Sequence, residues 1–157
     1  MEGFVPQELK ESIVHPVPKC YPPKTLSEDL RPITLTSQLA KVMEGIALDS
    51  LFACVKDKLD PKQFSVTGES TVQSMVYFLH CILESLERGE NYVRIFFADF
   101  SKGFDLVDHN VLMSELDLLG VNEYLQNWIA AFLTARPQRV KISGHTSSPV
   151  FPNGGIP

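Results

Sequence analysis

The acidic residues that follow a strongly apolar segment are the first candidates for chemistry in this sequence. Residues 94–109 read RIFFADFSKGFDLVDH, so Asp99 comes directly after the apolar run at 95–98. A carboxylate is costly to desolvate there, unless the strand ends at that point and the side chain emerges at its rim. Held at the end of a rigid strand, it suits Mg²⁺, which requires hard oxygen ligands in near-octahedral geometry. The alternative is a structural role, in which Asp99 caps the following turn.

Three further candidate ligands, two aspartates and a histidine, follow Asp99 in the same segment. Asp108 precedes a helical pattern and has the residue type of an N-cap, whereas Asp105 is consistent with a solvated side chain. His109 is predicted to be a surface residue, because no second His or Cys has metal-site spacing to it. A metal hydrolase that uses Asp99, Asp105, Asp108 and His109 together is an alternative to a single aspartate ligand.

The sequence predicts several short strands and one longer apolar strand that would position Asp99. Residues 92–99 form a continuous apolar segment, which is typical of a strand buried on both faces. Prolines in residues 13–35 exclude a long helix and favour an edge hairpin with strands near 12–17 and 31–35. PQRVKISGHTSSPVF predicts two further strands about a turn at Gly144.

Capping residues and apolar spacing predict helices between these strands. Ser37 precedes the first helix, Ser70 or Thr71 caps the second, and Asp108 caps the third. A fourth helix runs through residues 124–133. This irregular alternation predicts an α/β fold of the α+β type, with helices packed on a small mixed sheet.

Charge and cysteine content narrow the functional classes. The chain has 157 residues, with 14 basic and 19 acidic side chains and a formal net charge of −5. This charge disfavours tight nucleic-acid binding, which depends on Lys and Arg neutralising phosphates. The three cysteines form no CxxC pair and indicate neither a zinc ribbon nor a disulfide framework. Without a secretory signal pattern or a membrane-spanning apolar run, an intracellular protein is expected.

Several pieces of the sequence occur in an order that resembles the reverse transcriptase of non-LTR, LINE-like retrotransposons. They are VHPVPK, LSEDLRPITLTSQLAKVME, KQFSVTGEST, FFADFSKGFDLVDH, VLMSELDLLGV, NWIAAFLTAR, RVKISGHTSS and NGGIP. A single piece such as RPI is weak, but the whole series in register is specific. The resemblance implies a partial right-hand polymerase, with about 1–90 fingers-like, about 91–157 the first part of the palm, and the C-terminal palm and thumb missing.

The resemblance assigns the residues around Asp99 to catalysis and nucleotide binding. Asp99 matches the first metal-binding aspartate and would hold catalytic Mg²⁺. Phe104 matches the bulky gate residue beneath the sugar, whose ring leaves no room for a 2′-hydroxyl and so favours dNTPs over rNTPs. Phe100 and Gly103 would belong to the same nucleotide pocket, and Gly103 stands where the family more often has alanine.

The resemblance also assigns two basic residues to the incoming triphosphate. Lys19 of VPK and Arg31 of RPI match basic fingers residues, and the guanidinium fork of Arg suits phosphate. From the residues alone, a surface salt bridge from Arg31 to Glu28 or Asp29 is the preferred interpretation. RNA template, DNA primer and dNTPs are the implied partners, and a nuclear location would follow only from the family's use of chromosomal targets.

Other features argue against polymerase activity of this chain by itself. It contains no Asp-Asp pair, which the family carries in a later palm motif, and NGGIP stops before the Gln-Gly with which the family continues. Two Mg²⁺ about 3.5–4 Å apart need more than one carboxylate, so the chain alone is expected to be inactive. Glu69 replaces a residue that is usually basic, and this acidic chain is expected to bind nucleic acid weakly or not at all. A non-catalytic retroelement relic or binding module is the alternative function.

Overall fold

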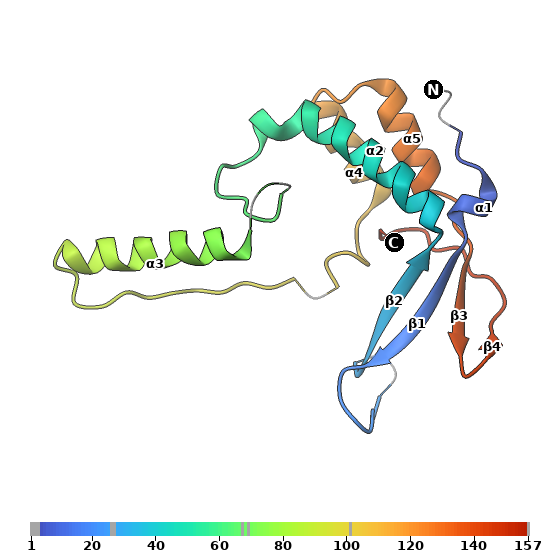
Figure 1. Ribbon diagram of the computed structural model, residues 1–157, viewed down its shortest axis with the longest axis horizontal. Helices are drawn as coiled ribbons and strands as arrows, with labels where there is room; N and C mark the ends of the chain where they lie inside the picture. The colour runs from blue at the N-terminus through green and yellow to red at the C-terminus, as the bar shows by residue number, and fades with distance from the viewer. Residues whose placement is uncertain (1–3, 26–27, 67, 69, 101, 157) are drawn as a thin grey trace. The chain divides into compact units, whose positions relative to one another are not determined.

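The chain forms two compact units. The structure is a computed structural model that describes residues 4–25, 28–66, 68, 70–100 and 102–156. Unit 1 comprises Met1–Val55 and Lys102–Pro157, and unit 2 comprises Lys56–Ser101. Figure 1 shows the order of the helices and strands along the chain.

Unit 1 contains, within its described residues, a four-stranded mixed sheet with the order β2-β1-β3-β4. β1 (Ser12–Pro18) and β2 (Leu30–Thr36) form an antiparallel hairpin. β3 (Gln138–Ile142) runs parallel to β1, and β4 (His145–Thr146) pairs antiparallel with β3. The predicted hairpin strands and the strand pair about Gly144 are therefore confirmed, as is the α/β class.

The prolines of β1 lie where this strand has only one neighbour. β3 pairs with residues 12–14 of β1, so that ladder ends before Pro16. Across the hairpin, Pro16 faces Pro32. Neither residue has an N–H to donate, so neither leaves a donor unpaired in the ladder.

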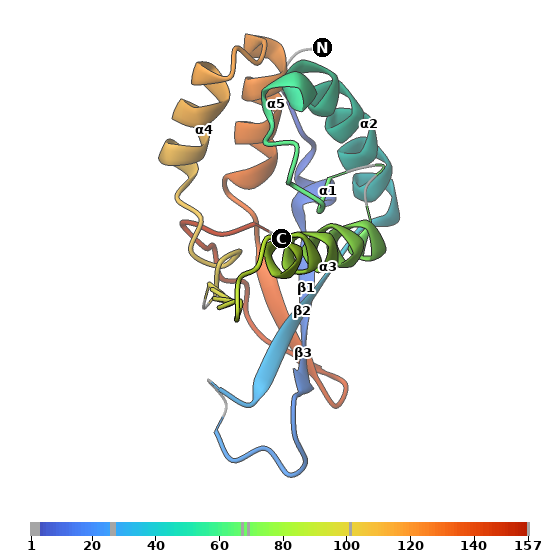
Figure 2. The ribbon, with the colours of Figure 1, turned by 90° about the vertical axis from the view of Figure 1, so that its left-hand side faces the viewer.

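The core of unit 1 lies between its helices. α1 (Gln7–Lys10), α2 (Gln38–Val55), α4 (His109–Leu118) and α5 (Glu123–Leu133) are grouped at one end of the strands (Figure 2). Trp128 and Phe132 of α5 stack with ring centroids 5.1 Å apart and pack with Ala40 of α2. The predicted starts of α2 after Ser37 and of α4 after Asp108 are confirmed. The single turn of α1 was not predicted, because four residues carry no usable periodicity.

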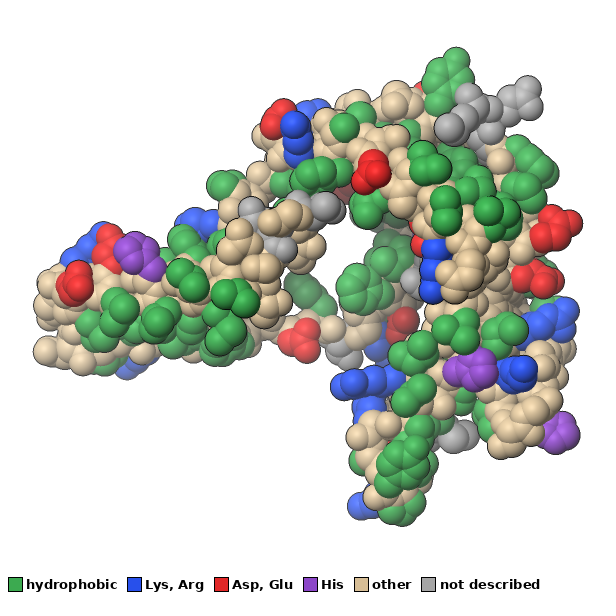
Figure 3. Space-filling view, in the orientation of Figure 1, with side chains coloured by type: hydrophobic (Ala, Val, Ile, Leu, Met, Phe, Trp, Pro, Cys, Tyr) green, Lys and Arg blue, Asp and Glu red, His purple; other side chains and the backbone are tan. Residues whose placement is uncertain are grey.

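Unit 2 contains the 3₁₀ turn η1 (Lys56–Lys58) and the amphipathic helix α3 (Thr71–Glu87). The hydroxyl oxygen of Ser70 accepts a hydrogen bond from the amide of Gln73 at 3.2 Å, which confirms the predicted N-cap. No residue of α3 is buried, and hydrophobic side chains cover much of its surface in Figure 3. None of the described helices is both long and apolar enough to cross a membrane.

The predicted strand at 92–99 is wrong. The segment forms neither helix nor strand, and Phe96 and Phe97 are 89% and 80% exposed. A strand buried on both faces needs a neighbouring strand and covering elements, and no described strand pairs with this segment. The ring of Phe97 lies 5.8 Å from that of Phe78 on α3. This contact covers the Phe97 side chain only in part.

Candidate functional site

Three basic side chains line one pocket of unit 1, here called the cationic pocket. Its volume is about 370 Å³, and Lys19, Arg31 and Lys102 line it together with Asp105. The antiparallel register explains how the first two meet, because Val17 pairs with Arg31 and Lys19 follows directly after β1. The structure thus brings together the two residues that the resemblance assigns to triphosphate binding, and adds Lys102 to them.

The loop between β1 and β2 is organised by Asp29. Its Oδ2 accepts hydrogen bonds from the amides of Lys24 at 2.8 Å and Thr25 at 2.9 Å. These backbone donors, that of Thr25 foremost, hold the pKa of Asp29 below its usual value. The ammonium group of Lys19 donates to the carbonyl of Glu28 at 2.6 Å, which fixes the direction of that side chain.

Arg31 does not form the salt bridge that the residues alone suggest. Within the described residues, the ion pair that the structure contains joins Arg88 to Glu84 on α3. The carboxylate of Asp29 instead accepts hydrogen bonds from the loop amides. The guanidinium of Arg31 is therefore exposed at the cationic pocket without a carboxylate partner among these residues.

The turn after Lys102 carries the two residues assigned to the sugar. Lys102 has a φ of 56°, and its carbonyl accepts a hydrogen bond from the amide of Leu106 at 3.1 Å. Gly103 and Phe104 lie in this turn, directly after a residue that lines the cationic pocket. The ring of Phe104 is 74% exposed and so is free to contact a ligand.

Asp108 and His109 have structural roles at the start of α4. Asp108 caps the helix by accepting hydrogen bonds from Asn110 at 2.7 Å and Val111 at 3.3 Å. His109 is half-buried, and its Nε2 lies 2.7 Å from the carbonyl oxygen of Gly155. His109 was predicted as a surface residue and not a metal ligand; the structure leaves it partly exposed and gives it a partner in a distant loop, which no local pattern reveals.

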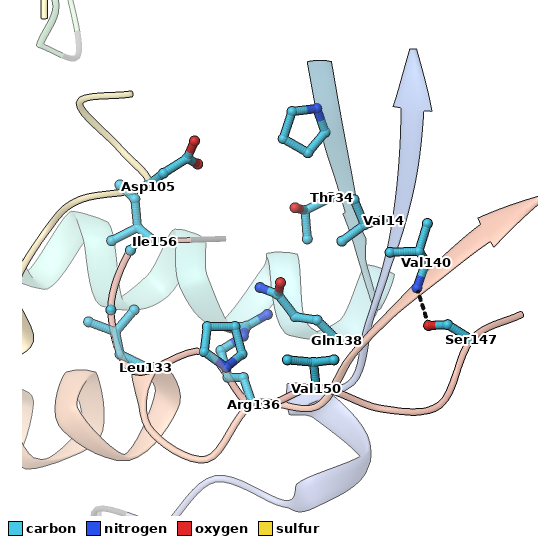
Figure 4. A pocket seen from close by; sticks show the side chains of 14 residues that line it. Val14, Thr34, Asp105, Leu133, Arg136, Gln138, Val140, Ser147, Val150 and Ile156 are labelled. Atoms are coloured by element: carbon cyan, nitrogen blue, oxygen red, sulfur yellow. Dashed lines mark hydrogen bonds between the residues drawn. The ribbon is translucent and has the colours of Figure 1, made fainter. Parts of the chain in front are cut away.

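A second pocket of unit 1, here called the loop pocket, has a volume of about 430 Å³. Figure 4 shows Thr34 and Gln138 from the sheet on one side, Asp105 and Ile156 on the other, and Arg136 below. The cationic and loop pockets are neighbours, since Asp105 lines both.

Arg136 is a polar residue of the loop pocket that sequence reasoning missed. It is only 3% exposed, and its guanidinium lies 4.5 Å from the ring centroid of Phe132. Its Nε and Nη2 have no hydrogen-bond partner among the described residues. Burial lowers the pKa of Arg136, and the negative charge of Glu44 opposes that shift.

Asp99 and Phe100 lie in unit 2, in the extended segment after α3, and both are exposed. A carboxylate at Asp99 is a suitable oxygen ligand for Mg²⁺. However, the described residues contain no group of three His, Cys, Asp or Glu side chains that could hold a metal ion. Glu69 lies outside the residues that the structure describes.

Comparisons with known proteins identify the family of the chain. Residues 18–157 match the family described as reverse transcriptase (RNA-dependent DNA polymerase). The chain is 27% identical over 157 residues to the probable RNA-directed DNA polymerase from transposon BS of Drosophila melanogaster, with 98% of this chain covered. It is 29% identical over 160 residues to the RNA-directed DNA polymerase from mobile element jockey of the same organism, with 99% covered. It spans 17% of the length of each relative. The chain thus belongs to the reverse transcriptase family.

Proposed function

We propose that this chain supplies the fingers and the first part of the palm of a retrotransposon RNA-directed DNA polymerase. Residues of about 1–90 would be fingers-like, and about 91–157 would begin the palm. The substrates would be an RNA template, a DNA primer and dNTPs. The observation that carries the proposal is the cationic pocket, which is lined by Lys19, Arg31 and Lys102. Gly103 and Phe104 follow directly after Lys102 in the chain.

The cationic pocket has the charge that a triphosphate requires. Arg31 has no carboxylate partner within the described residues, so its guanidinium can pair with phosphate oxygens in a bidentate geometry. Lys19 gives a hydrogen bond to the carbonyl of Glu28, which leaves it further donors and holds it in place. Lys102 adds a third positive charge from the segment that leads to Phe104.

The sugar and the metal complete the proposed site. Phe104, with Gly103 and Phe100, would contact the nucleotide, and the Phe104 ring would exclude a 2′-hydroxyl. Asp99 would be the first ligand of catalytic Mg²⁺, which when bound would stabilise the attacking and leaving oxygens. Because one carboxylate cannot hold two ions, we infer that the 157 residues by themselves do not extend a primer. The net charge of −5 also predicts weak binding of a template–primer duplex.

Equilibrium binding of a dNTP to variants of the cationic pocket tests the proposal. We expect Arg31→Ala to weaken binding about tenfold or more, because hydrogen bonds to charged groups contribute about 1.5–3 kcal/mol. Lys141→Ala is the matched control, since Lys141 is exposed on β3 and lines neither pocket. Equal effects of the two substitutions would show that the nucleotide senses net charge and not this pocket.

Primer extension separates the polymerase from the non-catalytic alternative, which the acidity and the missing Asp-Asp pair favour. The assay uses an RNA template, a DNA primer, dNTPs and Mg²⁺, with the chain and its Asp99→Ala variant. We expect no extension by either protein. Extension that Asp99→Ala abolishes would contradict the inferred inactivity, and dNTP binding without extension would support a chain that carries only part of the site.

A further inference from the structure

Two segments that are distant in sequence are joined by hydrogen bonds beside the proposed sugar gate. The amide of Gly155 donates to the carbonyl of Val107 at 2.8 Å, and the amide of Ile156 donates to the carbonyl of Phe104 at 3.1 Å. The third bond joins His109 to the carbonyl of Gly155 at 2.7 Å. We call these three hydrogen bonds the loop clamp.

The direction of the third bond is fixed by its chemistry. A carbonyl oxygen can only accept, so Nε2 of His109 carries the hydrogen and donates it. His109 is the first residue of α4, and the carboxylate of Asp108 caps that helix. The loop is thereby attached to the rigid start of a helix and not only to another loop.

The loop clamp also depends on close approach of two glycines. A Cβ on Gly155 would lie 2.9 Å from the carbonyl oxygen of Asp105, and a Cβ on Gly154 would lie 3.1 Å from that of Val107. Contacts below 3.0 Å require something to move. Asp105 lines both pockets, so a displaced loop would alter the wall that the two pockets share.

We propose that His109 and Gly155 are positioning residues that hold Phe104 in its turn between Lys102 and Asp105, which line the cationic pocket, and so set its discrimination between dNTPs and rNTPs. This inference rests on the proposed function, because it needs the nucleotide sugar to lie at Phe104. The main-chain bond from Ile156 reaches the carbonyl of Phe104 itself. Release of the loop frees the Phe104 backbone, and a mobile ring excludes a 2′-hydroxyl less well.

The test combines amide hydrogen exchange with nucleotide binding in three variants of the chain. His109→Ala removes the donor, His109→Gln retains an N–H close to the position of Nε2, and His145→Ala is a control on the exposed strand β4. One hydrogen bond contributes about 1 kcal/mol, so we expect exchange at Gly155 and Ile156 to rise roughly fivefold in His109→Ala. The same variant should lower the ratio of rNTP to dNTP dissociation constants, and His109→Gln should restore both readouts.

Each outcome decides a separate part of the proposal. Wild-type exchange at Gly155 in His109→Ala would overturn the loop clamp, and faster exchange with an unchanged nucleotide ratio would overturn its role in discrimination. Failure of the wild-type chain to bind any nucleotide would refute the proposed function and the specificity claim, while the exchange data would still decide the clamp. If His109→Ala does not fold, Gly154→Ala displaces the same loop and is expected to lower the same ratio.

Discussion

Substitution of two glycines by alanine separates backbone strain from close packing in the loop clamp. Gly155 has a φ of 82° and Gly144, in the turn between β3 and β4, has a φ of 84°. Both are left-handed conformations in which alanine costs about 1–2 kcal/mol. They differ in their surroundings, because a Cβ on Gly144 meets nothing within 4 Å, whereas one on Gly155 lies 2.9 Å from a backbone oxygen.

The close contact at Gly155 adds a further loss of stability, and the hydrogen bonds of the loop clamp set its upper limit. Moving the loop to relieve the contact breaks the bonds from Gly155, Ile156 and His109, at about 1 kcal/mol each. A released loop recovers backbone entropy, so about 3 kcal/mol is an upper limit. We therefore expect Gly144→Ala to lower the free energy of unfolding by about 1–2 kcal/mol and Gly155→Ala to lower it by a further 1–3 kcal/mol or so.

Urea unfolding measured by the fluorescence of Trp128 provides the assay. It is the single tryptophan of the chain and lies in the core of unit 1. Each variant is compared with the wild type. If the slope of the unfolding free energy against urea concentration is unchanged, the shift in the unfolding midpoint reports the change in stability. Equal destabilisation by the two substitutions would refute the close approach of Gly155 to Asp105, and with it the geometry of the loop clamp.

Three further predictions concern the elements around the site. Asp29→Ala should lower the protection of the Lys24 and Thr25 amides in hydrogen exchange. The folded pKa of Asp29 is depressed, so in the wild type this protection should be complete above the usual pKa of 3.8 and be lost as the pH falls through the folded pKa. Asp108→Ala removes the N-cap of α4 and should cost about 1 kcal/mol in urea unfolding. Trp128→Ala removes a stacked core ring and should cost about 3–5 kcal/mol, measured by circular dichroism.

Local chemistry accounts for the parts of the fold that could be predicted. Ser70 and Asp108 mark helix starts because their side chains satisfy free amides of the first turn, an interaction contained within a few residues. The parallel pairing of Ser12 with Gln138 could not be predicted, since no local pattern connects strands so far apart in sequence. The buried strand at 92–99 was wrong because such a strand requires a paired neighbour and covering elements; no described strand pairs with the segment, and Phe96 and Phe97 stay largely exposed.

Some residues of the candidate site could be predicted from local sequence signals, and others could not. Lys19 and Arg31 meet because of a hairpin whose strands the sequence pattern reveals, so their proximity follows from local signals. His109 escaped prediction because its partner, Gly155, is 46 residues away. Arg136 contacts the ring of Phe132 one helical turn earlier, but its burial to 3% exposure and the charge of Glu44 beside it come from packing that the sequence does not show. Side chains whose role depends on tertiary contacts give little sign of it in the sequence.

A crystal structure of the chain with a bound dNTP and Mg²⁺ would test the central claim most directly. We predict that the triphosphate lies against Lys19 and Arg31, that the sugar lies against the ring of Phe104, and that the carboxylate of Asp99 faces the phosphates. A nucleotide bound away from the cationic pocket, or a sugar that leaves Phe104 untouched, would contradict the assignment of this chain to the nucleotide site of a polymerase.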